Sequence, residues 1–332
     1  MDNNYQNTPK QQKVSVREQK KNRVMMAIAI TFTLLLVLFT VLLCINVVME
    51  LRGPSKSPDE ELPNDPADPS ENEQPSDGDT TVYQTISLSS RAIGEGSLIL
   101  VNASHVYQFP ATNDHLVDVY TEQENAKTRG VYFQLAKKLS MDKTAYQAMN
   151  KMLTEFARQS GRSTVLLADA YRSYEQQAAL NSATKAGYSD SHTGLSCALQ
   201  VSEGGHTGYL SDAAVYDWIY QNCHKYGFTV RYPAGKENVT GVSDYDYYFR
   251  YVGYPHAYAM KTRGLCLEEY VELLRNYSKE SPLKLTTDDG STYEIYYVTA
   301  TGEETAVTVP ADGSYTVSGD NKDGFIVTVK LS

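Results

Sequence analysis

Residues 217–233 read DWIYQNCHKYGFTVRYP, and they predict a helix that passes directly into a strand. The helix extends over residues 212–226, since its apolar residues recur at the spacing of one helical face: Val215, Trp218, Ile219 and Cys223. Gly227 provides a stop, and the apolar and β-branched run at residues 228–232 is typical of a short strand. This unit suggests a domain in which helices and strands are mixed.

The sequence before and after this unit repeats the mixture. Helices are expected at residues 140–161, 174–185 and 267–277, and short strands at residues 97–102 (SLILVN), 164–168 (TVLLA) and 249–252. Helices and strands follow one another without a regular βαβ rhythm. The predicted fold class is therefore α+β.

The pattern changes after residue 281. Strands are expected at residues 291–299, 304–309, 314–317 and 324–331, where polar and apolar residues alternate and Asp-Gly pairs mark the turns. No motif for chemistry occurs here. We interpret residues 282–332 as a small all-β module with a binding or spacer role.

The N-terminal part has a different composition. Residues 24–49, from Val24 to Met49, contain no charged side chain and are long enough to cross a bilayer as a helix. A buried core helix would show a polar face, and a signal peptide would have a shorter apolar run and a small-residue cleavage site, so a single-pass membrane anchor is the preferred interpretation. Six Lys and Arg residues in the tail of residues 1–23 place that tail in the cytoplasm and the bulk of the chain outside.

Residues 50–81 link the predicted anchor to the first globular residues. They are rich in Pro, Ser, Asp and Glu, which predicts a disordered, extended acidic stalk. The net charge of the chain is −10, which argues against nucleic acid as a partner. Only Cys197, Cys223 and Cys266 lie outside the predicted span, so they can form one internal disulfide at most.

Several blocks of sequence resemble the VanY-type D-alanyl-D-alanine carboxypeptidases. The segment from Ala170 to Gln176 (AYRSYEQ) resembles an SGYRS-x-x-x-Q signature, and W-I, K-Y-G-F and R-Y-P follow in residues 218–233. Thr240-Gly241, R-Y-V-G at residues 250–253 and P-H-A at residues 255–257 continue the match. The resemblance covers roughly residues 97–275. It implies a carboxypeptidase-like domain at residues 82–281, with helices around a small, mainly antiparallel sheet.

This resemblance implies a zinc peptidase of the bacterial wall, of Gram-positive type, that removes the terminal D-alanine from wall peptides. In the family, the metal is held by His, Asp and His, and a Glu three residues before the last His relays a proton. In this chain the corresponding positions hold Ser191, Ala198, Tyr248 and, for the Glu, Tyr245. Ala has no ligand atom, and neutral hydroxyls are poor zinc ligands. The expectation is that no zinc cofactor is bound.

Three neighbouring histidines are the candidate substitutes. His192 is one residue from a ligand position and His206 lies in another segment, so each is interpreted as a surface residue or as one behind a ligand position. His256 belongs to the P-H-A block and is interpreted as structural. The resemblance gives Arg172 the role of a substrate carboxylate anchor, although an ion pair that pins the turn is an alternative. Candidate binding residues around it are Tyr171, Ser173, Gln176 and Tyr247. The tyrosines at positions 245, 247 and 248 either fill vacated space or form a stacking surface.

Three functional hypotheses follow for this cell-surface protein. The preferred one is a zinc-less pseudoenzyme that binds the peptidoglycan stem peptide or a cell-wall protein. The second is an active D-Ala-D-Ala or LD-carboxypeptidase that trims wall peptides with an unconventional site. The third is a structural scaffold in which the old cleft is closed.

Overall fold

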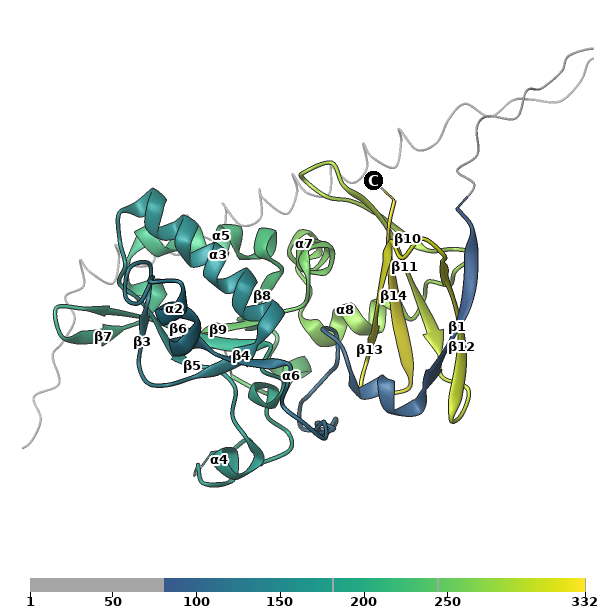
Figure 1. Cartoon of the computed structure of the whole chain (residues 1–332), viewed down its shortest axis with the longest axis horizontal. Helices are drawn as coiled ribbons and strands as arrows, with labels where there is room; N and C mark the ends of the chain where they lie inside the picture. The colour runs from purple at the N-terminus through teal and green to yellow at the C-terminus, as the bar shows by residue number, and fades with distance from the viewer. Residues whose placement is uncertain (1–80, 181, 244, 332) are drawn as a thin grey trace, which may run out of the picture. The chain divides into compact units, whose positions relative to one another are not determined.

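The computed structural model describes residues 81–180, 182–243 and 245–331 (Figure 1). The predicted cytoplasmic tail, the membrane span at residues 24–49 and nearly all of the stalk lie outside these residues. In the described part, no helix is both long and apolar enough to cross a membrane.

One six-stranded sheet forms the centre of the carboxypeptidase-like domain. Its order is β3 (Gln134–Leu135), β5 (Val165–Asp169), β6 (Ser196–Glu203), β9 (Tyr245–Tyr251) and β8 (Phe228–Tyr232), with β7 (His206–Gly208) paired to β6. Only the β3–β5 pair is parallel. The short strands β2 (Leu116–Asp118) and β4 (Ser140–Asp142) form a separate pair. The predicted α+β class with a mainly antiparallel sheet is confirmed.

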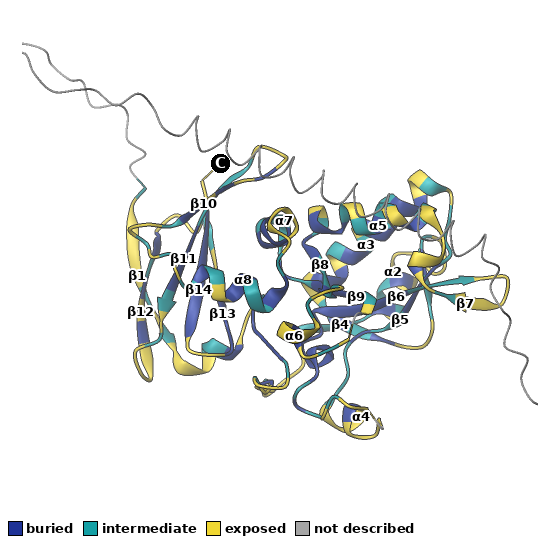
Figure 2. Cartoon of the chain, turned by 180° about the vertical axis from the view of Figure 1, so that it is seen from behind, coloured by how far each residue is buried: buried dark blue, intermediate teal, exposed yellow. Residues whose placement is uncertain are grey.

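The long helix α3 (Lys143–Ser160) packs against this sheet as its apolar spacing predicts. Asp142 caps its N-terminus by accepting from the backbone N–H groups of Thr144 and Ala145, and Gly161 ends it with a φ of 69°. Its inner face buries Met149, Met152 and Phe156 among others. The figure coloured by burial shows this inner face and the central strands in dark blue (Figure 2).

The remaining helices are short. They are α2 (Val119–Asn125), α4 (Tyr174–Ala178), α5 (Asp217–Asn222), α6 (Glu237–Thr240), α7 (Tyr254–Arg263) and α8 (Leu267–Leu274). Three of the predicted helices end early or are interrupted, and among them α8 ends at Leu274 rather than at residue 277. Residues 212–226 form α5 between 3-10 turns rather than one helix, and α4 ends at Ala178, because Gln177 donates to the carbonyl of Thr184 and holds the returning chain.

The β module contains two sheets. A four-stranded sheet has the order β10 (Leu283–Thr286), β11 (Thr292–Thr299), β14 (Gly324–Lys330) and β13 (Tyr315–Gly319). The fifth strand, β12 (Glu304–Pro310), pairs with β1 (Tyr83–Ser89), more than two hundred residues earlier in the chain. Residues 83–89 were assigned to the carboxypeptidase-like domain from sequence, but their pairing places them in the β module.

The segment SLILVN at residues 97–102 corrects one prediction. It is buried, as expected, but it is not a strand, and only Asn102 makes an isolated bridge, to His105. Its backbone groups are bound mostly by side chains from distant elements. Ser318 accepts from the N–H of Leu98, Arg250 donates to the carbonyls of Ser97 and Ile99, and Asn321 donates to the carbonyl of Leu100.

The module and the carboxypeptidase-like domain share a hydrophobic core. Side chains of α7 and α8 pack against one face of the four-stranded sheet, through residues such as Met260, Leu274, Ile295 and Tyr297. The opposite face of that sheet packs with β1 and β12 around Val307 and Phe325. Cys197, Cys223 and Cys266 are all buried and free.

Candidate site at the degenerate metal positions

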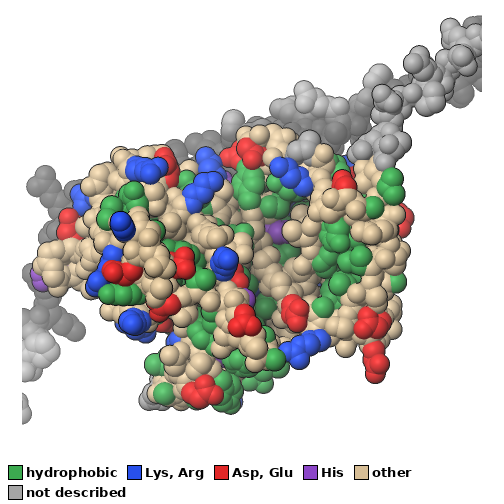
Figure 3. Space-filling model, in the orientation of Figure 1, with side chains coloured by type: hydrophobic (Ala, Val, Ile, Leu, Met, Phe, Trp, Pro, Cys, Tyr) green, Lys and Arg blue, Asp and Glu red, His purple; other side chains and the backbone are tan. Residues whose placement is uncertain are grey.

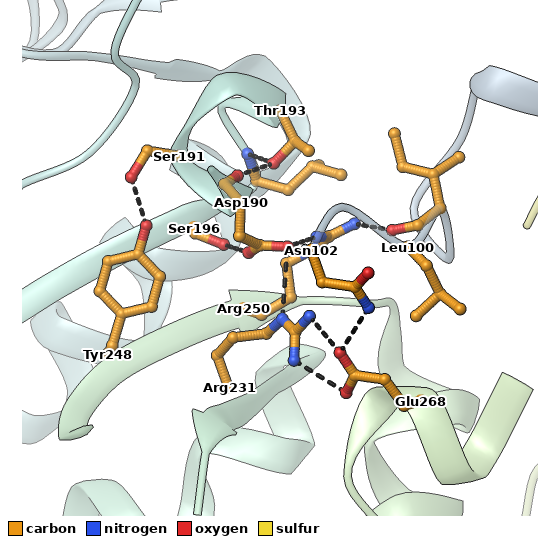
Figure 4. Close-up of polar contacts among 12 residues, drawn as sticks. Leu100, Asn102, Asp190, Ser191, Thr193, Ser196, Arg231, Tyr248, Arg250 and Glu268 are labelled. Carbon is orange, nitrogen blue, oxygen red and sulfur yellow. Dashed lines mark hydrogen bonds and ion pairs between the residues drawn. The ribbon is translucent and has the colours of Figure 1, made fainter. Parts of the chain in front are cut away.

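The structure brings the three candidate metal positions together. Ala198 on β6 lies directly opposite Tyr248 on β9 in the antiparallel register, and Ser191 lies in the turn η2 (Asp190–Thr193) that precedes β6. The Ser191 and Tyr248 hydroxyls are 2.5 Å apart and share a hydrogen bond, which Figure 4 shows. All three residues are buried. The three positions assigned from sequence therefore lie at a single place in the fold.

Arg172 points at this place from the turn after β5. Its Nη2 donates to the Ser191 hydroxyl at 2.7 Å, and its Nε lies 3.2 Å from a carboxylate oxygen of Asp169. The Arg172 side chain is 21% exposed, and no hydrogen bond to its Nη1 is seen within the described residues. Arg172 is thus ion-paired with Asp169 and keeps part of its side chain exposed.

These residues do not fit a zinc ion. Zinc in a peptidase site needs three nitrogen, sulfur or carboxylate ligands and an open position for water. Here the oxygen atoms available to a metal are the neutral hydroxyls of Ser191 and Tyr248, which bond to each other. The positively charged guanidinium of Arg172 donates to the Ser191 hydroxyl. Within the residues that the structure describes, no three His, Cys, Asp or Glu side chains gather in a way that could hold a metal ion.

Tyr245, at the position of the family Glu, lies apart from the Ser191–Tyr248 bond. It is the first residue of β9, pairs with Tyr232 of β8 and is 42% exposed. Its ring lies 5.6 Å from that of Tyr247, which in turn lies 5.3 Å from that of Tyr209. These three rings form a partly exposed tyrosine patch. Tyr248 instead stacks on Tyr232 at 5.6 Å, so it fills space inside the site.

Two of the predicted binding residues have a local structural role. Ser173 and Gln176 form a capping box at the start of α4, in which the Ser173 hydroxyl accepts from the backbone N–H of Gln176 and the side-chain Oε1 of Gln176 accepts from the backbone N–H of Ser173. Tyr171 is half-buried beside Asn113, and burial raises the pKa of its hydroxyl. Ligand binding by Tyr171, Ser173, Gln176 and Tyr247 stays a prediction.

The three histidines have surface or structural positions, and only His192 differs from its expected location. His192 was expected at the surface or behind a ligand, but it is fully buried, and it bonds through Nδ1 to the carbonyl of Arg172 and through Nε2 to the N–H of Gly187. His256 bonds to the hydroxyls of Tyr270 and Thr328. His206 is exposed on β7.

A buried network of charges lies next to Ser191, and sequence reasoning missed it (Figure 4). Asp190 accepts from Arg250 and from the Ser196 hydroxyl, and its Oδ1 lies 3.3 Å from Nε of Arg231. Arg231 also makes a bidentate pair with Glu268, at 3.0 and 2.7 Å. Asp190, Arg231 and Arg250 are buried completely or nearly so. Arg231 occurs in the matched block R-Y-P and Arg250 in the matched block R-Y-V-G. Their presence in these blocks was the feature of the sequence that could have pointed to the network.

The network keeps its charges in spite of burial. Burial by itself would raise the pKa of Asp190, but Arg250 and Arg231 beside it hold that pKa below the usual range. Burial would lower the pKa of Arg231, yet Asp190 and Glu268 keep it well above its ordinary value. Through Arg250 and Glu268 the network also binds residues 97–102, so it fixes η2 relative to the segment that leads to the β module.

The fold and the site together define a class: a carboxypeptidase-like domain whose candidate metal positions lie on an antiparallel sheet and on the turn before β6. The family model described as VanY, D-alanyl-D-alanine carboxypeptidase, matches residues 138–254. A D-alanyl-D-alanine carboxypeptidase of Enterococcus faecium is 31% identical over 305 residues, covering 90% of this chain and 95% of the relative. This chain belongs to the VanY family of D-alanyl-D-alanine carboxypeptidases.

Two further relatives agree with this assignment. The putative carboxypeptidase YodJ of Bacillus subtilis is 32% identical over 151 residues, covering 40% of this chain and 51% of the relative. The solved structure of the vancomycin resistance D,D-dipeptidase VanXYg, in complex with a D-Ala-D-Ala phosphinate analogue, is 25% identical with a TM-score of 0.65. That match covers 75% of this chain and 99% of the other.

Proposed function

We propose that this VanY-family member binds the D-Ala-D-Ala end of a peptidoglycan stem peptide without hydrolysing it. The proposal rests on one observation. Arg172, whose role in the family is inferred to be the carboxylate anchor, is retained and partly open at a site whose metal positions hold Ser191, Ala198 and Tyr248. A guanidinium can bind a terminal carboxylate through paired hydrogen bonds, and this binding needs no metal.

The tyrosine patch supports the same proposal. Tyr209 and Tyr245 are 48% and 42% exposed, and their rings flank that of Tyr247. Aromatic side chains that present both a ring face and a hydroxyl are suited to binding amphipathic ligands.

The place of action belongs to the proposal too. The uncharged stretch at residues 24–49 and the acidic, Pro-rich residues that follow are features of an anchored protein with a spacer. We propose that the anchor holds the domain on the outer side of the cell membrane, within reach of the wall.

The test is a titration of the purified full-length chain with a synthetic stem peptide that ends in D-Ala-D-Ala. We expect binding that weakens by about tenfold or more in Arg172→Ala, since a hydrogen-bonded charge contributes roughly 1.5–3 kcal/mol. Arg162→Ala is the matched control, because Arg162 makes an exposed ion pair with Glu203 at the surface. The same peptide with a C-terminal carboxamide should bind as weakly to the wild type as the acid does to Arg172→Ala.

A scaffold with a closed cleft is the second candidate. The burial of Ser191, Ala198 and Tyr248 favours it, because the space next to Arg172 is partly filled. Absence of binding to the acid peptide would support the scaffold and contradict the proposal. Release of D-alanine during the titration would contradict both and support an active site of an unconventional kind.

A further inference from the structure

A separate cleft of about 950 Å³ lies between the β module and the carboxypeptidase-like domain. It is visible as the hollow between the two halves of the space-filling view (Figure 3). Residues 314–318 of the module line one side, and Asp114, Asp142 and Tyr251 are among those that line the other. Arg172, Ser191 and Tyr248 do not line it, so this cleft is distinct from the site described above.

Strand β13 presents a free edge to this cleft. It is the last strand of its sheet and pairs only with β14. The N–H of Lys330 donates to the carbonyl of Ser314, which makes these two residues a hydrogen-bonded pair. By the alternation of an antiparallel ladder, Thr316 also bonds to β14, whereas the N–H and C=O groups of Tyr315 and Val317 point away from the sheet.

The edge is closed at one end only. The outward N–H of Gly319 donates to the carbonyl of Glu95, and Gly96 lies so close to Ser318 that a Cβ there would be 2.4 Å from its hydroxyl oxygen. Among the described residues, no backbone hydrogen bond satisfies the outward groups of Tyr315 and Val317. An unpaired strand edge of this kind is a template for an added strand.

The side chains along the edge leave room for that strand. Thr316 projects to the same face as Thr328, whose hydroxyl bonds to His256 of the carboxypeptidase-like domain. Thr328 is buried, yet Thr316, one strand further out, is exposed. The two domains therefore touch at β14 and separate at β13, and the opening follows the strand.

The charges in the cleft indicate the chemistry of its occupant. Arg91 and Glu95 pair with each other at 3.8 Å. On the carboxypeptidase-like side, the lining carboxylates are Asp114, which is exposed, and Asp142, the cap of α3. Lys330 lies at the Ser314 end of β13, and His115 lines the cleft beside Asp114. The lining residues of the carboxypeptidase-like side thus include two carboxylates and no Lys or Arg.

We propose that this cleft binds an extended, basic L-peptide segment of a partner protein, which adds to β13 as a further strand. The peptide backbone pairs with the outward groups of Tyr315 and Val317, and its basic side chains meet Asp114 and Asp142. Strand addition of this kind gives affinity through main-chain hydrogen bonds and selectivity through alternate side chains.

The test uses fluorescence anisotropy of the full-length chain with a labelled peptide that alternates threonine and lysine. We expect binding to weaken by about tenfold or more in Val317→Pro, which removes one outward N–H and no bond within the sheet. Lys284→Pro is the matched control. The N–H of Thr287 donates to the carbonyl of Ser291, so by the same alternation Lys284 on β10, the other edge strand, has an outward N–H.

Two further measurements keep the result independent of any folding defect. A peptide N-methylated on the side that pairs with β13, and a peptide with glutamate in place of lysine, should each bind about tenfold more weakly to the wild type. Asp114→Asn should weaken the lysine peptide and not the glutamate peptide. Equal binding of the N-methylated peptide would overturn strand addition, and equal binding of the glutamate peptide would overturn the charge assignment. A dimer that Val317→Pro dissociates would show that a second copy of the chain is the occupant.

Discussion

At the scale of single residues, the three positions assigned from sequence lie together. Residue 198 lies opposite residue 248, and η2 brings residue 191 to the same point. The resemblance implies that metal ligands stood at these positions, where this chain has Ser, Ala and Tyr. This part of the site could be predicted from sequence, because the matched blocks fix which residues share the family positions.

The buried charges next to the site could not be predicted in the same way. Asp190 is one residue before Ser191, and nothing local in the sequence says that two arginines from β8 and β9 converge on it. Their meeting depends on the antiparallel order of distant strands. A stretch such as Ser189-Asp190-Ser191 is by itself equally typical of an exposed turn.

We expect Asp190→Asn to lower the free energy of unfolding by about 3–5 kcal/mol, because it leaves Arg231 and Arg250 with an uncompensated buried charge. Urea unfolding followed by circular dichroism would measure this loss. The matched control is Glu203→Gln, which breaks the exposed Arg162 pair and should cost less than about 1 kcal/mol. Equal costs for the two variants would contradict the role given to the network.

At the scale of elements, the correct and the incorrect predictions both rest on local sequence patterns. Helix α3 was predicted because its apolar spacing and the following glycine act locally. Residues 97–102 were predicted as a strand from the same kind of local pattern, yet their partners are side chains of Arg250, Ser318 and Asn321. A run of apolar residues predicts that a segment is buried. Its conformation depends on which groups form hydrogen bonds with its backbone N–H and C=O groups.

Helix α7 offers a test of how the elements are joined. Burial lowers the pKa of His256 to about 3, because the ring is enclosed between Tyr270 of α8 and Thr328 of β14. The unfolded chain binds a proton at this residue near pH 6.5, whereas the folded chain does so only near pH 3. Between these values the unfolded state holds more protons, so the histidine makes stability fall as the pH decreases.

We expect His256→Gln to make the fall in unfolding free energy between pH 6.5 and about pH 4 less steep, by up to roughly 1.4 kcal/mol per pH unit. His224, whose pKa burial also lowers, to about 4, continues to contribute in the variant. The measurement is urea unfolding at a series of pH values, with His206→Gln on the exposed β7 as control. An unchanged slope in His256→Gln would show that His256 does not stay neutral in the folded state.

At the scale of the whole molecule, the chain returns on itself. Strand β1 begins the described part and pairs with β12 near its end, so the carboxypeptidase-like domain is inserted between pieces of the β module. The alternating strands of residues 291–331 were evident from sequence, but β1 was not assigned to them. Pairing across such a separation leaves no local pattern, and only the three-dimensional structure reveals it.

Arg275, which follows α8, fastens the module to the domain. It donates to both carboxylate oxygens of Asp323 and to the hydroxyl of Tyr297, and its Nη1 lies 3.5 Å from buried Asp320. We expect Arg275→Ala to cost about 2 kcal/mol in unfolding free energy and to speed amide exchange in β13 and β14 more than in β6. Lys284→Ala, which removes an exposed pair with Glu294, is the control. Uniform exchange changes in all three strands would contradict a local fastening role.

We propose that the site at Ser191, Ala198 and Tyr248 does not hold catalytic zinc. The most direct test of this proposal is the metal content of the purified full-length chain after incubation with zinc and removal of the excess. The triple variant Ser191→His, Ala198→Asp, Tyr248→His serves as the positive control, since it restores the family ligands on the same backbone. We predict no retained zinc in the wild type and near-stoichiometric zinc in the triple variant. Near-stoichiometric zinc in the wild type, accompanied by release of D-alanine from a stem peptide, would contradict the account.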